Sequence, residues 1–126
     1  MSHGAFMWNE LMTNDVEKAK SFYGATIGWT IDEMPMPDGS GSYWIAKVDG
    51  KPAAGIMNMT GMVPPGTPPH WFAYIEVDDV DARVKKIAAS GGKLHREPFD
   101  IPDVGRIAIV ADATGAMVGW MTPKQH

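Results

Sequence analysis

The sequence predicts an α+β fold, in which two tandem β-α-β-β-β modules form a curved mixed sheet around a concave cleft and place their helices on the outer face. Two observations predict this class. Residues 5–62 align with residues 69–126, without a gap, when the chain is displaced by 64 positions along itself. In each half, one apolar stretch precedes a helix signal and three further extended stretches follow it. The 126 residues are therefore expected to form one domain, with module one at about 5–62, a linker at 63–69 and module two at about 70–126.

The internal repeat is recognised by the kind of residue that matches. Only about 9 of the 58 aligned pairs are identical. They include Asp15 with Asp79, at the predicted helix starts, and Gly28 with Gly92, at the predicted helix ends. Backbone geometry selects the residue type at such positions. Two copies of this length are typical of paired modules, because a solenoid needs three or more repeats.

Each module opens with a predicted strand that is followed by a predicted helix. The strands lie at residues 6–13 and 70–77, which are short and rich in aromatic and apolar side chains. A polar residue with an acidic residue three positions later is typical of a capping box, and this pattern follows both strands. The two candidate boxes are Asn14 with Glu17 and Asp78 with Asp81. The glycines that would end these helices in a left-handed cap are Gly28, Gly91 and Gly92.

Three shorter strands complete each module. Pro, Gly and Asp residues mark the turns between these extended stretches. The strands are predicted at 29–34, 43–48 and 53–59 in module one, and at 93–98, 106–111 and 116–121 in module two. The stretch from Val63 to Pro69 is rich in Pro and Gly, and it is therefore the predicted linker between the modules.

The composition excludes several classes of partner. A net charge of −4 and a pI near 5.4 argue against binding to nucleic acid or to an anionic membrane, because both require a basic surface. No apolar run approaches the roughly 20 residues that cross a bilayer, and the N-terminus lacks the pattern of a signal peptide. The absence of cysteine excludes disulfides and thiolate sites. We expect a cytoplasmic protein.

The order of the elements and several short motifs resemble the vicinal oxygen chelate superfamily, also called the glyoxalase/bleomycin-resistance/dioxygenase family. The motifs are Trp8-Asn9-Glu10-Leu11-Met12-Thr13, Phe22-Tyr23-Gly24, Gly28-Trp29, Pro69-His70-Trp71 and Asp112-Ala113-Thr114-Gly115. The resemblance covers nearly the whole chain and is closest to the branch described as lactoylglutathione-lyase relatives. This superfamily includes lyases, epimerases, dioxygenases, thiol transferases and drug-binding proteins, so the resemblance implies the fold more narrowly than the function. It also implies a homodimer.

The resemblance implies a divalent metal, held by one residue from the first strand and one from the last strand of each module. The first lies seven residues before the acidic residue at the helix start, and the second lies four residues after a turn glycine. The four positions in this chain are Trp8, Gly55, Phe72 and Gly119. None of these side chains can coordinate a divalent ion, which needs carboxylate, imidazole or thiolate donors. We therefore expect no metal and no other cofactor, although an alignment shifted by two residues would bring in Glu10 and Tyr74.

The same strands predict a small-molecule pocket on the concave face. Residues two apart in a strand point to the same face, so the neighbours of the four positions also line it. The predicted apolar lining consists of Phe6, Trp8, Gly55, Met57, Phe72, Gly119 and Met121. The three polar groups that converge on it are Glu10, His70 and Tyr74. Such a composition is typical of ligand sites, and we expect the two glycines to leave room for the ligand.

Three roles are open for Glu10. Aromatic surroundings would raise the pKa of its carboxyl group and prepare it for proton transfer, with His70 as the partner acid or base. The carboxylate could instead contact a ligand without catalysis. A third role is structural, through bonds to backbone amides or to an arginine such as Arg106. Structural alternatives also exist for His70, as the residue at which a strand begins, and for Tyr74, as a core aromatic.

Two functions follow from these observations. As a binding protein, the chain would hold an apolar or aromatic metabolite or drug in its cleft without a metal. As an enzyme, it would be a metal-independent lyase or isomerase that uses Glu10 and His70 to move a proton on a small carbonyl compound. We favour binding, because most catalysis in the superfamily depends on a metal that polarises substrate oxygens, and the ligands for that metal are missing from the sequence.

Overall fold

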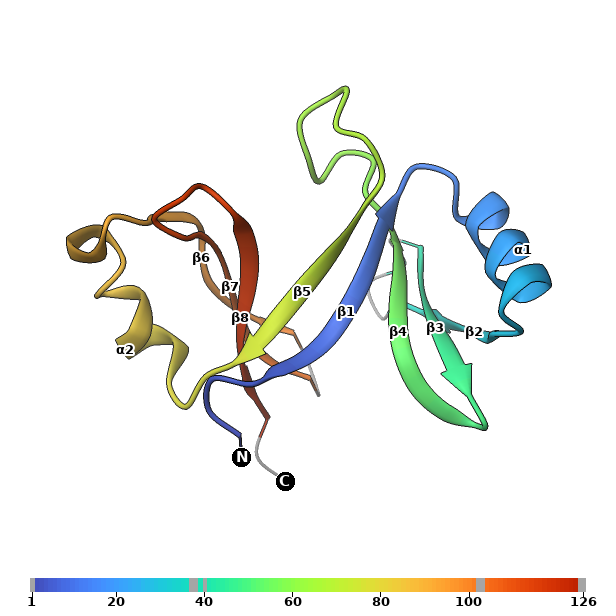
Figure 1. Ribbon diagram of the computed structural model, residues 1–126, viewed down its shortest axis with the longest axis horizontal. Coiled ribbons are helices and arrows are strands. Elements are labelled where there is room, and N and C mark those ends of the chain that lie inside the picture. Colours follow the sequence, from blue (N-terminus) through green and yellow to red (C-terminus); the bar gives the residue numbers. More distant parts are fainter. Residues whose placement is uncertain (1, 37–38, 40, 102–103, 125–126) are drawn as a thin grey trace. The chain divides into compact units, whose positions relative to one another are not determined.

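A computed structural model describes residues 2–36, 39, 41–101 and 104–124 of the chain. These residues belong to two compact units. The module-one unit is Trp8–Trp71, and the module-two unit combines Met1–Met7 with Phe72–His126. In each unit, paired strands form a sheet and helical segments lie beside it (Figure 1).

The module-one unit follows the β-α-β-β-β order. Its elements are β1 (Phe6–Thr13), which belongs to this unit from Trp8 onwards, α1 (Val16–Thr26), β2 (Thr30–Pro35), β3 (Ser42–Val48) and β4 (Lys51–Asn58). The strands pair in the order β2-β3-β4-β1. The β1–β4 pair is parallel, whereas the β2–β3 and β3–β4 pairs are antiparallel. The parallel pairing brings the first and last strands of the module together and places Glu10 opposite Gly55.

The module-two unit repeats this order. Its elements are β5 (His70–Glu76), α2 (Val80–Val84), the 3₁₀ helix η1 (Ala88–Ser90), β6 (Lys93–Ile101), β7 (Gly105–Ala111) and β8 (Met117–Pro123). The strands pair in the order β5-β8-β7-β6, and the β5–β8 pair is the parallel one. Tyr74 lies opposite Gly119. This pair therefore corresponds to Glu10 and Gly55 of module one.

The predicted α+β class with two β-α-β-β-β modules is confirmed. All eight predicted strands are present in the predicted order, and the largest difference is at β6, which continues to Ile101. The helix of module two is shorter than the apolar spacing suggests. After Val84, backbone hydrogen bonds join residues three apart, such as Ile87 to Val84, so the chain tightens into a 3₁₀ turn.

The helices begin one residue later than the predicted capping boxes. The Asp15 carboxylate accepts a hydrogen bond from the backbone N–H of Lys18 at 3.0 Å, and the Asp79 carboxylate accepts one from Ala82 at 3.2 Å. The caps predicted at Asn14 and at its counterpart in module two are therefore wrong. An N-cap directly precedes the first helical residue, and the aspartates hold that place in both modules.

The predicted left-handed helix ends are confirmed at Gly28, with φ +78°, and at Gly91, with φ +87°. Gly92 differs, because its role is steric: a Cβ atom there would lie 2.7 Å from the carbonyl oxygen of Ala111. The helices are short, and no helix in the described part of the chain is long and apolar enough to cross a membrane.

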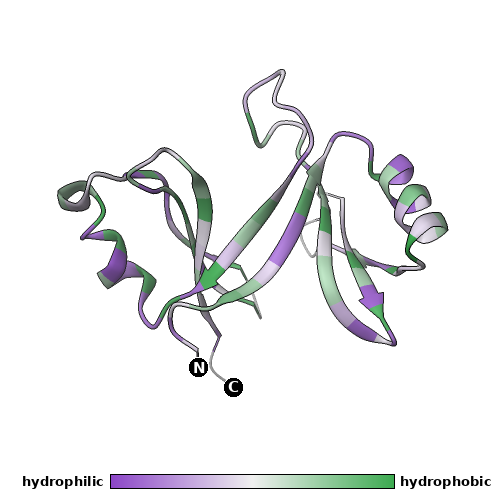
Figure 2. Cartoon of the chain, viewed as in Figure 1, coloured by the Kyte–Doolittle hydropathy of each residue, from purple (hydrophilic) through white to green (hydrophobic). Residues whose placement is uncertain are grey.

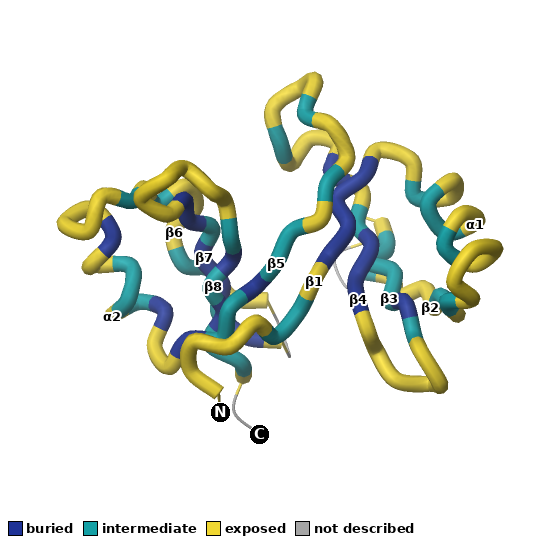
Figure 3. Tube along the Cα trace, in the orientation of Figure 1, coloured by how far each residue is buried: buried dark blue, intermediate teal, exposed yellow. Residues whose placement is uncertain are grey.

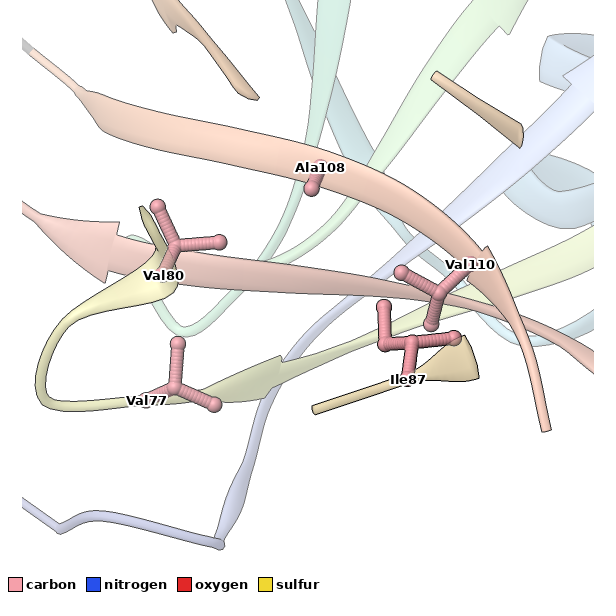
Figure 4. Packing of buried hydrophobic residues seen from close by; sticks show 5 residues of the cluster. All are labelled: Val77, Val80, Ile87, Ala108 and Val110. Carbon is pink, nitrogen blue, oxygen red and sulfur yellow. The ribbon is translucent and has the colours of Figure 1, made fainter. Parts of the chain in front are cut away.

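The buried apolar residues of each unit come from its strands and from the segments that pack on them. In the module-two unit they include Val77, Val80, Ile87, Ala108 and Val110, which pack against one another (Figure 4). In the module-one unit, buried positions cluster on β1, β3 and β4 (Figure 3), and those whose side chains face α1 include Leu11, Ala46 and Ile56. The other face of the module-one sheet, away from α1, carries the alternate residues of these strands, among them Glu10 and Gly55.

Candidate functional site

One face of the module-one sheet carries the polar groups of interest. Gly55 lies opposite Glu10 on β1 and opposite Ile45 on β3, so these residues share one face. Trp44 points to the other face, where the Lys20 amine of α1 lies 3.5 Å from the centre of its ring. The Glu10 face is therefore the face away from α1. Figure 2 shows a hydrophilic stretch within β1, to which Glu10 belongs.

Three side chains on this face form a hydrogen-bonded network. The indole Nε1–H of Trp8 donates to the hydroxyl oxygen of Tyr43 at 2.8 Å. The Tyr43 hydroxyl also bonds to the carboxylate of Glu10, a residue that is only 6% exposed. Burial, together with the charge of Glu10, raises the pKa of Tyr43 well above its ordinary range. The phenol therefore stays protonated and donates its hydrogen to Glu10, and we call these three residues the Trp8–Tyr43–Glu10 network.

Gly55 provides the space for this network. A Cβ atom at Gly55 would overlap the hydroxyl end of the Tyr43 side chain. The glycine is thus required by close packing and not by an unusual backbone angle, since its φ is not positive. We expected Gly55 to leave room for a ligand, and this detail needs correction because the Tyr43 phenol occupies that room.

The module-two sheet has an apolar counterpart of this arrangement. A Cβ atom at Gly119 would overlap the Tyr74 ring, so the room expected there is occupied as well. The Tyr74 ring meets the Phe72 ring edge to face, with their centroids 5.3 Å apart. The 64-residue offset places Tyr74 at the position of Glu10 and an isoleucine at the position of Tyr43. Module two therefore has no equivalent of the acid–phenol pair.

His70 makes the kind of contact that we considered as its structural role, at the point where a strand begins. The ring Nδ1 of His70 lies 2.9 Å from the carbonyl oxygen of Pro68, directly before β5. The pairing of His70 with Glu10 stays a prediction. Glu10 forms a hydrogen bond with Tyr43. Arg106, which we considered as a structural partner of Glu10, forms ion pairs with two aspartates of the module-two unit.

Tyr43 is not among the site residues that we predict from the sequence. Two signals point to it in retrospect. A glycine inside a strand often marks close approach by another group, and Gly55 is such a residue. Strand alternation then places Tyr43 on the same face as Ile45, which lies opposite Gly55.

An open groove lies at the start of α1 within the module-one unit, and the residues that line it include Val16 and Glu17 but none of the network residues. Its volume is about 520 Å³, which is within the range of small-molecule sites. The residues that line it include Met36, Trp44, Met57, Met62, Ser42 and Asn58. Met57 follows Gly55 by two positions on β4 and shares its face, whereas Ser42 shares the face of Trp44, which is the face of α1. Flexible thioethers adapt to different ligand shapes, so the groove suits an apolar molecule. The other predicted lining residues differ in exposure, since Phe6 is 68% exposed and Met121 is buried.

Comparison with known protein families decides where the chain belongs. Residues 5–119 match the family described as Glyoxalase/Bleomycin resistance protein/Dioxygenase superfamily. The chain belongs to this superfamily. The resemblance noted in the sequence is thereby confirmed, and the match extends over both modules.

Two relatives and one solved structure illustrate the breadth of the glyoxalase superfamily. "Putative glyoxylase CFP32" of Mycobacterium bovis is 43% identical over 119 residues, which cover 94% of this chain and 46% of the relative. "Anthracycline biosynthesis protein DnrV" of Streptomyces peucetius is 33% identical, over 90% of this chain and 45% of the relative. This chain thus spans about half the length of both relatives. Methylmalonyl-CoA epimerase from Mycobacterium tuberculosis shares the fold, with a TM-score of 0.66 and 19% identity over 96% of this chain and 89% of the epimerase.

The metal of the glyoxalase superfamily does not fit the residues at its implied positions. Those positions are Trp8, Gly55, Phe72 and Gly119, which offer no carboxylate, imidazole or thiolate. At Gly55 the adjacent space is taken by Tyr43. Across the described residues, no three side chains of the His, Cys, Asp or Glu type are grouped so that they could hold an ion.

Proposed function

We propose that this glyoxalase-superfamily chain binds a small apolar or aromatic molecule on the module-one sheet, without the superfamily's divalent metal. The observation that carries the proposal is the Trp8–Tyr43–Glu10 network. Its indole belongs to Trp8 and its phenol lies beside Gly55, the two positions of module one at which the resemblance implies metal ligands, and the phenol is hydrogen-bonded to the Glu10 carboxylate. The groove at the start of α1 in the same unit, with its methionines and a tryptophan, supports an apolar ligand.

The named relatives support a small organic ligand without identifying it. One is named a glyoxylase, another an anthracycline biosynthesis protein, and a protein of the same fold is an epimerase. This chain spans about half the length of the two relatives, so a second copy of it would supply a comparable number of residues. We therefore include a homodimer in the proposal, together with a cytoplasmic location and no nucleic-acid or membrane partner, in keeping with the net charge of −4.

A second candidate is a metal-independent lyase or isomerase that acts on a small carbonyl compound. The observation that favours it is the buried Glu10 carboxylate, hydrogen-bonded to a protonated phenol. Such a carboxylate can accept a proton from a carbon atom next to a carbonyl group. In this candidate Glu10 is the base and His70 supplies the acid.

The two candidates predict different effects of the same variants. If the chain is a binding protein, Trp8→Phe should weaken the binding of aromatic probes that can accept a hydrogen bond from the Trp8 indole, such as phenol, by about tenfold, since the loss of a hydrogen bond of about 1.4 kcal/mol corresponds to this factor. Trp29→Phe is the matched control, because Trp29 stacks on Tyr23 away from the network. Calorimetric titration measures both affinities. Equal affinities of the two variants would contradict a site at Trp8.

An enzyme should instead lose turnover in Glu10→Gln while its affinity for the substrate persists. Glutamine keeps the size and the hydrogen-bonding oxygen of Glu10 but cannot act as a base. The assay follows deuterium exchange next to the carbonyl group of small ketones and aldehydes in D₂O, by NMR. Exchange that is catalysed by wild-type protein and abolished in Glu10→Gln would favour the enzyme. Exchange at the uncatalysed rate would favour the binding protein.

A further inference from the structure

We propose that the ligand of the module-one site is an uncharged aromatic hydroxyl compound, and that the Tyr43 phenol occupies the place of its ring when the ligand is absent. This inference rests on the proposed function and adds the chemical class of the ligand. In the absence of that ligand, the Tyr43 side chain acts as its internal substitute.

The hydrogen bonds of the network define which chemical group fits between Trp8 and Glu10. In the network, one oxygen atom accepts a hydrogen from Trp8 Nε1 and gives its own hydrogen to Glu10. A hydroxyl group can do both at once. An ether oxygen could accept from Trp8 but has nothing to donate to Glu10, and a hydrocarbon could do neither. The fixed pair of indole donor and carboxylate acceptor therefore selects a hydroxyl group.

The surroundings of the Tyr43 hydroxyl favour an uncharged group. The nearby carboxylate and the burial of the site hold the Tyr43 phenol in its neutral form, as its raised pKa indicates. The same surroundings would act on any hydroxyl that replaced it, because a phenolate would lie beside the Glu10 carboxylate with little water to separate the charges. The ligand must therefore carry its hydroxyl protonated.

The position of the Tyr43 side chain allows it to leave the space beside Gly55. Tyr43 is the second residue of β3, and its side chain is half-buried, whereas Glu10 at the inner end of the network is buried. A change of side-chain rotamer would withdraw the phenol and leave the backbone pairing of β3 intact. The ring space beside Gly55, which has no side chain, would then be open to a ligand.

Module two provides a contrast within the same chain. There the ring beside Gly119 belongs to Tyr74, which is only 8% exposed and lies directly opposite the glycine in the parallel β5–β8 pair. A buried side chain of this kind is part of the core, and no carboxylate takes the place that Glu10 has in module one. The inference therefore applies to module one alone.

The test uses p-cresol, which reproduces the tyrosine side chain, with 4-methylanisole as its methyl ether and toluene as its hydrocarbon core. Binding is measured by calorimetry with the full wild-type chain and with Tyr43→Ala. We expect wild-type protein to bind p-cresol at least about tenfold more tightly than either analogue. We expect Tyr43→Ala to bind p-cresol at least about tenfold more tightly than wild type, because no internal phenol competes.

A second measurement keeps the test decisive if Tyr43→Ala does not fold. The indole Nε1–H resonance of Trp8, assigned with Trp8→Phe, should shift in wild-type protein when p-cresol is added and stay unchanged with 4-methylanisole. Equal binding of the three probes, or no gain in Tyr43→Ala when it folds, would overturn the inference and leave the proposed function standing. If neither these probes nor phenol bind to wild-type protein, the proposed function fails together with the inference.

Discussion

Tyr43→Phe is expected to lower the free energy of unfolding by about 2–3 kcal/mol, because the variant removes one oxygen atom that serves two partners, the buried Glu10 and the half-buried Trp8. The Glu10 carboxylate loses the phenol as a hydrogen-bond donor, and the Trp8 indole loses its acceptor. A hydrogen bond to a charged group contributes about 1.5–3 kcal/mol, which is more than a bond between neutral groups. The phenylalanine ring preserves the packing beside Gly55, so the effect isolates the hydroxyl group.

Urea denaturation measures this effect, and the chain offers a matched control. Tyr23→Phe makes the same chemical change at a ring that stacks on Trp29, and it should alter stability by less than about 0.5 kcal/mol. A double-mutant cycle of Tyr43→Phe with Glu10→Gln should yield a coupling energy of about 1–2 kcal/mol. If Tyr43→Phe is as stable as Tyr23→Phe, the network does not hold the fold as described.

Gly119→Ala is expected to destabilise the protein by about 2–3 kcal/mol, although it adds only one methyl group. That methyl group would overlap the Tyr74 ring and would lie 3.1 Å from a Phe72 ring carbon. Tyr74 is buried, so its ring cannot turn towards solvent without disturbing the surrounding core. The added volume therefore has to be absorbed by strain.

Two other glycines make this prediction specific. Gly55→Ala should cost about as much as Gly119→Ala but for another reason, because the half-buried Tyr43 side chain can move outward only if its hydroxyl gives up the bonds to Trp8 and Glu10. Gly24→Ala should stabilise the protein by about 0.5–1 kcal/mol, since Gly24 lies within α1 and its nearest neighbour is 3.8 Å from the added atom. Thermal or urea denaturation of the three variants ranks them. A Gly119→Ala protein as stable as Gly24→Ala would contradict the described packing of module two.

The sequence predicts the order of the elements well because strand alternation and turn residues are local signals. The helix starts are displaced by one residue, since Asn14 and Asp15 are both good N-caps and only the fold decides which of them precedes the first turn. The shortness of α2 could not be predicted, because its apolar spacing continues to Ile87 although the backbone has already changed to a 3₁₀ turn. Element types were thus predictable, whereas the starts of both helices and the end of α2 were not.

The candidate site was predictable in its positions and not in its contacts. Trp8, Glu10 and Gly55 follow from the repeat and from strand alternation. Their partner Tyr43 lies 35 positions from Trp8 in the chain, and only the pairing of β3 with β4 brings its side chain over Gly55. Long-range pairing of this kind leaves no local pattern. The sequence therefore indicated an empty space beside Gly55, whereas the structure places a phenol there.

The most direct test of the central claim, that a side-chain network replaces the superfamily's metal, is elemental analysis. Protein purified without metal is incubated with nickel, zinc, iron and manganese in turn, passed through a desalting column and analysed for bound ions. We predict far less than one ion per chain for each metal, because the implied positions provide no suitable donors. Retention of one ion per chain in wild-type protein, lost in Glu10→Gln, would show that Glu10 is a metal ligand and would contradict the account.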